Sequence, residues 1–247
     1  MKFGINNPAF LQMAGAKSQK PLSVFWIEAV DRFNLTGDLM PGQQFVSDAQ
    51  LSFRVGDGDW EDYIGIRYIP IQPGQRVYFR NVRKVSFSRD TYDNIIYTNG
   101  AKYNIGGDLF SVMYPDRQEL FSNAFVELFK GQPIVSAAEL DIKQAEIPAE
   151  ATSCYAGMFS ECEFLLSAPK LPATILTEGC YSGMFSDCTN LSTITCLAED
   201  ISASQCLDNW VLNVGENGTF IKSANMAEWP EGDGGIPTGW TVQDYIG

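Results

Sequence analysis

The sequence predicts a mainly β protein with short helices. It would have an N-terminal antiparallel β-sandwich of immunoglobulin-like size, followed by a short repeat solenoid with a C-terminal β cap. Three observations predict this: β-forming runs separated by turn residues in the first half, a motif that recurs after 26 residues in the second, and further β-forming runs after the repeats. The chain has 247 residues, 45% of them hydrophobic, which is an ordinary globular composition.

The pattern divides the chain into four segments. Residues 1–20 show little periodicity and contain Asn-Asn-Pro, so we expect an arm or linker there. Residues 21–112 are the expected sandwich. Its signals include the run "LSVFWIEAV", a hairpin about Gly-Asp-Gly in "LSFRVGDGDWEDYIGI" and a hairpin at Asn99-Gly100. Residues 113–216 are the expected repeats, and residues 217–247 the expected cap.

An acidic turn stands out in the predicted sandwich. Asp57, Asp59 and Glu61 lie around Trp60 in "GDGDWED", which is compatible with a Ca²⁺ loop or with the carboxylate pair of a sugar hydrolase. A calcium loop of the EF type needs glycine at its sixth position and glutamate at its twelfth, where this chain has Asp62 and Tyr68. We therefore favour an exposed hairpin turn and keep calcium as the alternative.

Basic residues concentrate in "RVYFRNVRKVSFSR", which contains Arg76, Arg80, Arg83, Lys84 and Arg89. Alternation in a strand would place several of them on its solvent side, which is the interpretation that we favour. The alternative is a docking surface for an acidic neighbour, including another copy of this chain.

The second half repeats itself. "CYAGMFSEC" at residues 154–162 returns as "CYSGMFSDC" at residues 180–188, and a further step of 26 aligns Cys180 with Cys206. A degenerate earlier copy begins at Ala124. This period is typical of solenoids, in which successive units bury a continuous core. The predicted repeat core consists of Cys154, Tyr155, Met158, Phe159, Cys162, Leu165, Cys180, Tyr181, Met184, Phe185, Cys188, Leu191, Cys206 and Trp210.

Within one unit, Tyr181, Met184, Phe185 and Cys188 fall at i, i+3, i+4 and i+7, which predicts one face of a short helix, and "LSTIT" predicts a short strand. Buried reduced thiols are the interpretation that we favour for the cysteines, because cysteine is small and commonly buried. Disulfides between stacked units suit the expected spacing poorly, and a spacing of eight residues without histidine suits zinc poorly. Both stay open as alternatives.

The pattern C-Y-x-G-M-F-S-x-C-x-x-L, followed by a short strand and L-P-A, resembles the BspA-like leucine-rich repeats. The segments at residues 102–114 and 217–242 are similar to those that flank such repeats. This family is abundant in surface proteins of gut anaerobes and in proteins of their phages. The resemblance implies a right-handed β/α solenoid used in adhesion or assembly, and it brings no catalytic residues.

After the repeats, "GTFIKS" and "GWTV" predict two strands that cover the last unit, with Trp229 and Trp240 as the bulk of this cap.

Charge and composition exclude several classes of function. Residues 1–120 contain 13 basic and 13 acidic side chains, so residues 121–247 supply the whole net charge of −13, which makes a nucleic acid an unfavourable partner. Histidine is absent, which removes the commonest general base. No apolar stretch approaches the roughly 18 residues of a membrane span, so we expect no membrane insertion. No cofactor is expected either.

These observations together predict a non-enzymatic structural or adhesion protein. The first hypothesis is a virion component of a tailed phage of gut bacteria, such as a head-decoration, fibre or tail-associated subunit. It is motivated by the absence of a signal-peptide pattern in the first 20 residues. The alternative is a bacterial cell-surface adhesin with leucine-rich repeats, and the remote alternative is a carbohydrate-active enzyme. Expected partners are other virion proteins, a host-surface protein or glycan, or further copies of this chain.

Overall fold

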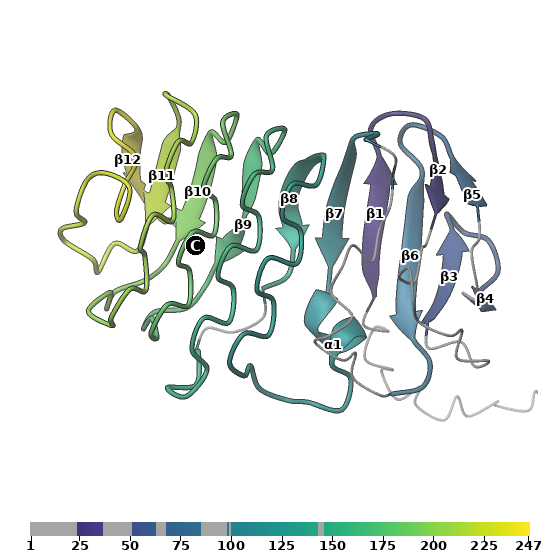
Figure 1. Cartoon of the computed structure of the whole chain (residues 1–247), viewed down its shortest axis with the longest axis horizontal. Coiled ribbons are helices and arrows are strands. Elements are labelled where there is room, and N and C mark those ends of the chain that lie inside the picture. The colour runs from purple at the N-terminus through teal and green to yellow at the C-terminus, as the bar shows by residue number, and fades with distance from the viewer. Residues whose placement is uncertain (1–23, 37–50, 63–67, 85–97, 99, 143–145) are drawn as a thin grey trace, which may run out of the picture.

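The protein is mainly β and contains one large open sheet (Figure 1). The computed structural model describes residues 24–36, 51–62, 68–84, 98, 100–142 and 146–247. Its strands are β1 (Phe25–Ala29), β2 (Phe33–Thr36), β3 (Leu51–Val55), β4 (Glu61–Asp62), β5 (Tyr68–Ile71), β6 (Arg76–Asn81), β7 (Tyr103–Gly107), β8 (Ile134–Leu140), β9 (Ser167–Leu171), β10 (Thr193–Cys196), β11 (Thr219–Lys222) and β12 (Thr241–Asp244). The ten-stranded sheet has the order β12-β11-β10-β9-β8-β7-β1-β6-β3-β4, and β2 pairs separately with β5.

The first half contributes the antiparallel part of this sheet. Strands β7, β1, β6, β3 and β4 pair in that order, and all of these pairs are antiparallel. Alternation explains β6, in which Val77 and Phe79 are buried while Arg76, Tyr78 and Arg80 face the other side and stay partly exposed. The hairpin predicted about Gly-Asp-Gly is confirmed as the β3–β4 pair. The predicted arm, residues 1–20, and Asn99 of the other predicted hairpin lie outside the described residues.

The second half contributes the parallel part. Each of β8 to β12 pairs in parallel with the strand before it, beginning with β7 and β8. The sheet therefore runs without interruption past residues 112 and 113, where we predicted one segment to end and the next to begin. Parallel neighbours need crossover connections, and here the repeated motifs form these crossovers.

The prediction of short helices in the repeats is wrong. The motif segments around residues 153–162 and 179–188 are chains of tight turns, and the only helix among the described residues is α1 (Leu109–Met113), capped by Asp108. In the second of these segments, Gly179, Gly183 and Asp187 have φ angles near +60°, so every fourth residue is left-handed. A residue with positive φ at the third position of a four-residue turn is typical of a type II turn, and it interrupts a helix.

Backbone hydrogen bonds explain why this turn chain is stable. Alternate N–H groups bond within a turn, as Met184 N donates to Tyr181 O at 3.0 Å. The intervening ones donate to the next unit, as Phe159 N does to Met184 O at 2.9 Å and Phe185 N to Trp210 O at 2.8 Å. Half of the N–H groups of a unit are thus satisfied within its own turns and half by the next unit, whereas a helix would satisfy them all within the segment.

Two columns of aromatic rings fill the space between the turns and the sheet. In one column, Phe129, Phe159, Phe185 and Trp210 follow one another with ring centroids 5.5 to 6.1 Å apart. In the other, Tyr155 lies between Phe125 and Tyr181. The core is therefore continuous along the repeats.

Strands β11 and β12 continue the parallel array. The predicted cap strands are thus the last two strands of the large sheet. Trp240 is buried and donates from Nε1 to Gly215 O at 2.7 Å, while Trp229 stacks on Trp210 with a centroid distance of 6.1 Å. Trp229 thus covers the end of the aromatic column.

Candidate contact surface

The fourteen predicted repeat-core residues all lie in the interior. Each of them is at most 3% exposed. All six cysteines of the chain are buried and unpaired. The structure therefore brings the motif side chains together between the turns and the sheet, and none of them reaches the surface.

The thiols are unreactive in this buried environment. Burial raises the pKa of Cys162, Cys180 and Cys196 to about 12, so these groups are neutral thiols near pH 7. The reactive form of cysteine is the thiolate, which these side chains do not populate. Among the described residues, no three histidine, cysteine, aspartate or glutamate side chains form a group that could hold a metal ion.

Two thiols have a structural task that sequence reasoning missed. Cys162 Sγ donates to Phe129 O at 3.0 Å, and Cys188 Sγ donates to Phe159 O at 3.0 Å. Each of these cysteines thus binds a carbonyl of the preceding unit. The recurrence of cysteine at the end of both motifs could have indicated this hydrogen bond. Cysteine is a small apolar side chain that can also donate a hydrogen bond, and neither serine nor alanine combines these two properties.

The surface of the repeats is formed by the outer face of β8 to β12. One row of this face has a hydroxyl group on every strand, because the strand register aligns Ser136, Ser167, Thr193, Thr219 and Thr241. These side chains are partly or fully exposed, whereas Ala168, Ile194 and Phe220, which follow them in the chain, are buried. Neighbouring strands lie about 4.8 Å apart, so this hydroxyl row is a regularly spaced array.

A second row runs beside the hydroxyl row. It contains Lys170, Thr195, Ile221 and Gln243 on successive strands. Lys170 Nζ donates to Tyr245 Oη at 2.9 Å and lies 4.6 Å from the centroid of that ring. The end of the chain therefore returns to this face. The surface thus combines a row of hydroxyl groups with a row of mixed side chains.

The acidic turn is exposed. Asp57, Asp59 and Glu61 all have exposed side chains between β3 and the end of β4, and Trp60 beside them is partly buried. Ser52 Oγ contacts Asp62 Oδ1 at 3.4 Å across the hairpin. The turn thus has the exposed character of a hairpin loop, and neither of the two cavities described below includes it.

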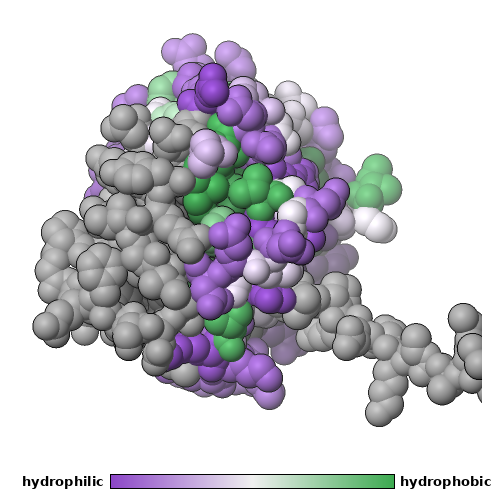
Figure 2. Space-filling view, turned by 90° about the vertical axis from the view of Figure 1, so that its right-hand side faces the viewer, coloured by the Kyte–Doolittle hydropathy of each residue, from purple (hydrophilic) through white to green (hydrophobic). Residues whose placement is uncertain are grey.

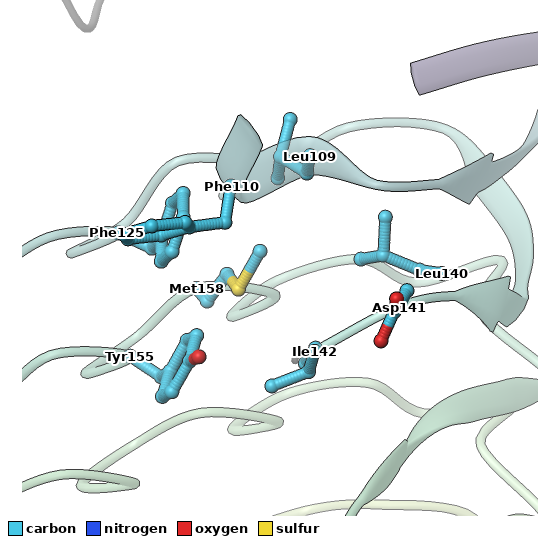
Figure 3. Close-up of a pocket in the computed structure, with 8 residues that line it drawn as sticks. All are labelled: Leu109, Phe110, Phe125, Leu140, Asp141, Ile142, Tyr155 and Met158. Atoms are coloured by element: carbon cyan, nitrogen blue, oxygen red, sulfur yellow. The ribbon is translucent and has the colours of Figure 1, made fainter. Parts of the chain in front are cut away.

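One small, partly open cavity lies between α1 and the first repeat units (Figure 3). Its volume open to water-sized molecules is about 10 Å³, which is room for about one water. The side chains around it are hydrophobic apart from Asp141 and the Tyr155 hydroxyl, as Figure 3 shows. This cavity is too small for a substrate.

The other cavity is an open depression of about 480 Å³ on the repeats. It is lined by Glu146, Ile147, Ala149, Thr174, Ile175, Leu176, Thr177, Glu178 and Ala203. Ile175 is 60% exposed at its surface. Five of its nine lining residues are aliphatic, and the others are two glutamates and two threonines. Thr177 Oγ1 donates to Ala151 O at 2.8 Å.

Sequence reasoning also missed a layered stack of arginine and aromatic side chains on β3 and β6. The guanidinium carbons of Arg54 and Arg80 lie 5.3 and 4.1 Å from the Trp60 ring centroid, and that of Arg54 also lies 4.8 Å from Tyr78. The sequence shows basic and aromatic residues alternating in this region. Only strand pairing reveals which of them meet.

Comparison with protein-family models, with curated proteins and with solved structures finds no match. No helix among the described residues has the length and apolar character needed to cross a lipid bilayer.

Proposed function

We propose that this chain is a non-enzymatic structural and adhesion protein, and that it is a component of the virion of a tailed phage of gut bacteria. Its proposed place is a head-decoration, fibre or tail-associated subunit, in contact with other virion proteins or with a protein or glycan of the host surface.

The proposed architecture is an immunoglobulin-like β-sandwich joined to a short right-handed solenoid of BspA-like leucine-rich repeats. The motif at residues 154–165 and its copy at residues 180–191 support this assignment. The parallel strands β8 to β12, linked by turn segments that bond from unit to unit, are compatible with it.

The single observation that carries the contact function is the division of the repeats into a closed interior and an exterior with a regularly spaced hydroxyl row. The side chains with reactive chemistry, the six thiols, are interior and neutral. The exterior presents the aligned hydroxyl row from Ser136 to Thr241. A surface of this kind supports recognition by shape and hydrogen bonding and does not provide groups for bond cleavage.

Purified phage particles provide the test. Mass spectrometry of particles purified on a density gradient should detect this chain at a fixed copy number, and electron cryomicroscopy should place its β sheet on the head or tail. Absence of the chain from purified particles would refute the virion assignment.

The cell-surface adhesin remains the second candidate, because the same hydroxyl row would serve it equally. Labelling intact bacteria with an antibody against the chain distinguishes the two. Surface labelling of uninfected cells supports the adhesin, whereas labelling that appears only after infection supports the virion component.

A further inference from the structure

The stack on β3 and β6 is built by strand register. Arg54 pairs with Tyr78, and Ser52 pairs with Arg80, so both arginines lie on the same face of the sheet. Trp60, in the turn after β3, is the ring that both guanidinium groups contact. All four stacked side chains are partly exposed. Figure 2 looks onto this end of the molecule, where mostly hydrophilic residues surround a smaller hydrophobic area.

The two arginines of this stack have no acidic partner among the described residues. Their Nε atoms are buried without any hydrogen-bond acceptor. Arg76, on the same strand, shows the contrast, because its guanidinium binds Glu28 at 2.6 Å and Glu139 at 3.2 Å. Arg54 and Arg80 are therefore held by aromatic rings. Their buried Nε atoms are out of reach of a ligand, so it is the terminal N–H groups of these partly exposed side chains that would donate to another molecule.

We propose that Arg54, Arg80, Trp60 and Tyr78 form a binding site for an acidic polysaccharide, one that carries carboxylate or sulfate groups on its sugar rings. The guanidinium fork matches the paired oxygens of such groups, and the charge-assisted hydrogen bonds are among the strongest available. The partly exposed rings add apolar surface for the C–H face of a sugar. This inference rests on the proposed contact function, because it names the chemical class of one ligand.

Charge distribution favours a sugar over a nucleic acid. The chain carries a net charge of −13, and residues 121–247 supply all of it. The exposed acids Asp57 and Asp59 also lie in the turn beside the stack. A polymer with a phosphate on every unit would meet repulsion from these groups, whereas a polysaccharide with more widely spaced acidic groups can place one of them on the arginines.

The test is direct binding by the full chain. Isothermal titration with κ-carrageenan and with hyaluronate, a sulfated and a carboxylated probe whose acidic groups lie only on alternate sugars, should show binding that weakens between about 0.05 M and about 0.5 M salt, as screening requires. Dextran, which is neutral, and single-stranded poly-dT should not bind. Binding to only one of the two acidic probes identifies the acidic group and still supports the site.

Charge-removing variants locate the site. Arg54→Gln and Arg80→Gln should each weaken binding by about tenfold or more. The matched control is Arg117→Gln, because Arg117 also stacks on a ring, 4.1 Å from the Phe121 centroid, but lies elsewhere. Affinity of this control should be unchanged. Circular dichroism checks that each variant is folded. If a variant does not fold, the salt dependence of binding by the unmodified chain still tests the proposal.

Three results would overturn the proposal: no binding of either acidic probe at low salt, equal losses in the Arg80→Gln and Arg117→Gln variants, or tighter binding of poly-dT. Self-association that Arg80→Gln abolishes, without polysaccharide binding, would assign the stack to contact between copies instead. A failure of this kind leaves the virion assignment intact, because that assignment is tested on particles.

Discussion

The ring of Phe25 stacks on the ring of Phe129, with centroids 6.2 Å apart and planes inclined by 21°. Phe25 belongs to β1 in the antiparallel part of the sheet, and Phe129 belongs to the turn segment of the first repeat unit. This contact joins the two halves of the chain through one hydrophobic core. Together with the β7–β8 pair, it makes the repeats an extension of the first half.

We predict that the two halves unfold as one cooperative unit. Phe129→Ala should lower the free energy of unfolding by about 3 to 5 kcal/mol, since it removes a buried ring. A double-mutant cycle with Phe25→Ala should give a coupling of about 0.5 to 1.5 kcal/mol. Urea titrations followed by tryptophan fluorescence and by far-ultraviolet circular dichroism measure both quantities. Two separate transitions in the unmodified chain would contradict the shared core.

The buried thiols should be protected from chemical labelling. The native protein should release almost no thionitrobenzoate from Ellman's reagent near neutral pH, and all six thiols should react once denaturant unfolds the chain. Cys188→Ala should in addition destabilise the fold by about 1 to 2 kcal/mol, because Phe159 O loses one of its two donors, keeping Cys162 N at 3.1 Å, and a small cavity forms. Rapid labelling of several cysteines in the native state would be incompatible with this interior.

Stability should fall in alkaline solution. Burial raises the pKa of Cys162, Cys180 and Cys196 from the ordinary 9.0 to about 12, so the folded state holds these protons more tightly than the unfolded state does. Their contribution to stability is complete below about pH 9 and is lost as pH rises from about 9 to about 12. Urea midpoints measured across this range should decrease, and midpoints from pH 7 to 8 should be constant with respect to these groups.

The turn chain makes a specific prediction for glycine. Gly183 has φ +60°, and a β-carbon added there would meet no atom within 4 Å. Gly183→Ala should therefore destabilise the protein by about 1 kcal/mol through backbone strain alone. Gln205 has φ 56° and occupies the position of the next unit that corresponds to Gly179. Gln205→Gly should therefore stabilise the protein. Thermal unfolding of both variants gives the comparison, and equal effects of the same sign would argue against the turn geometry.

The hydroxyl row should tolerate substitution without loss of the fold. Thr193→Lys changes a side chain on the outer face, so the free energy of unfolding should stay within about 0.5 kcal/mol of the original value. Incorporation into particles, or attachment to the partner, should decrease. The buried control is Thr177→Val, which removes the hydrogen bond from Oγ1 to Ala151 O at 2.8 Å and should lower stability instead. Unchanged incorporation of Thr193→Lys would place the contact elsewhere.

Self-similarity along the chain is sufficient to identify the repeat core. Cys180, Tyr181 and Phe185 recur at a constant offset from Cys154, Tyr155 and Phe159, and a residue that recurs in every stacked unit occupies the same interior position. The local conformation does not follow in the same way. A spacing of four residues suits a helix and a chain of period-four turns equally, and the glycines at residues 179 and 183 were the available hint of turns.

By itself, the sequence determined the β character of the chain, the period of its second half and the identity of the repeat interior, because these properties depend on composition and on order along the chain. Only the tertiary structure decided that the motifs are turns, since alternate N–H groups in them are satisfied by carbonyls of a neighbouring unit. It also decided that Arg54 and Arg80 meet on Trp60. That meeting depends on the register of β3 against β6, and hydrogen bonds between distant segments set such a register.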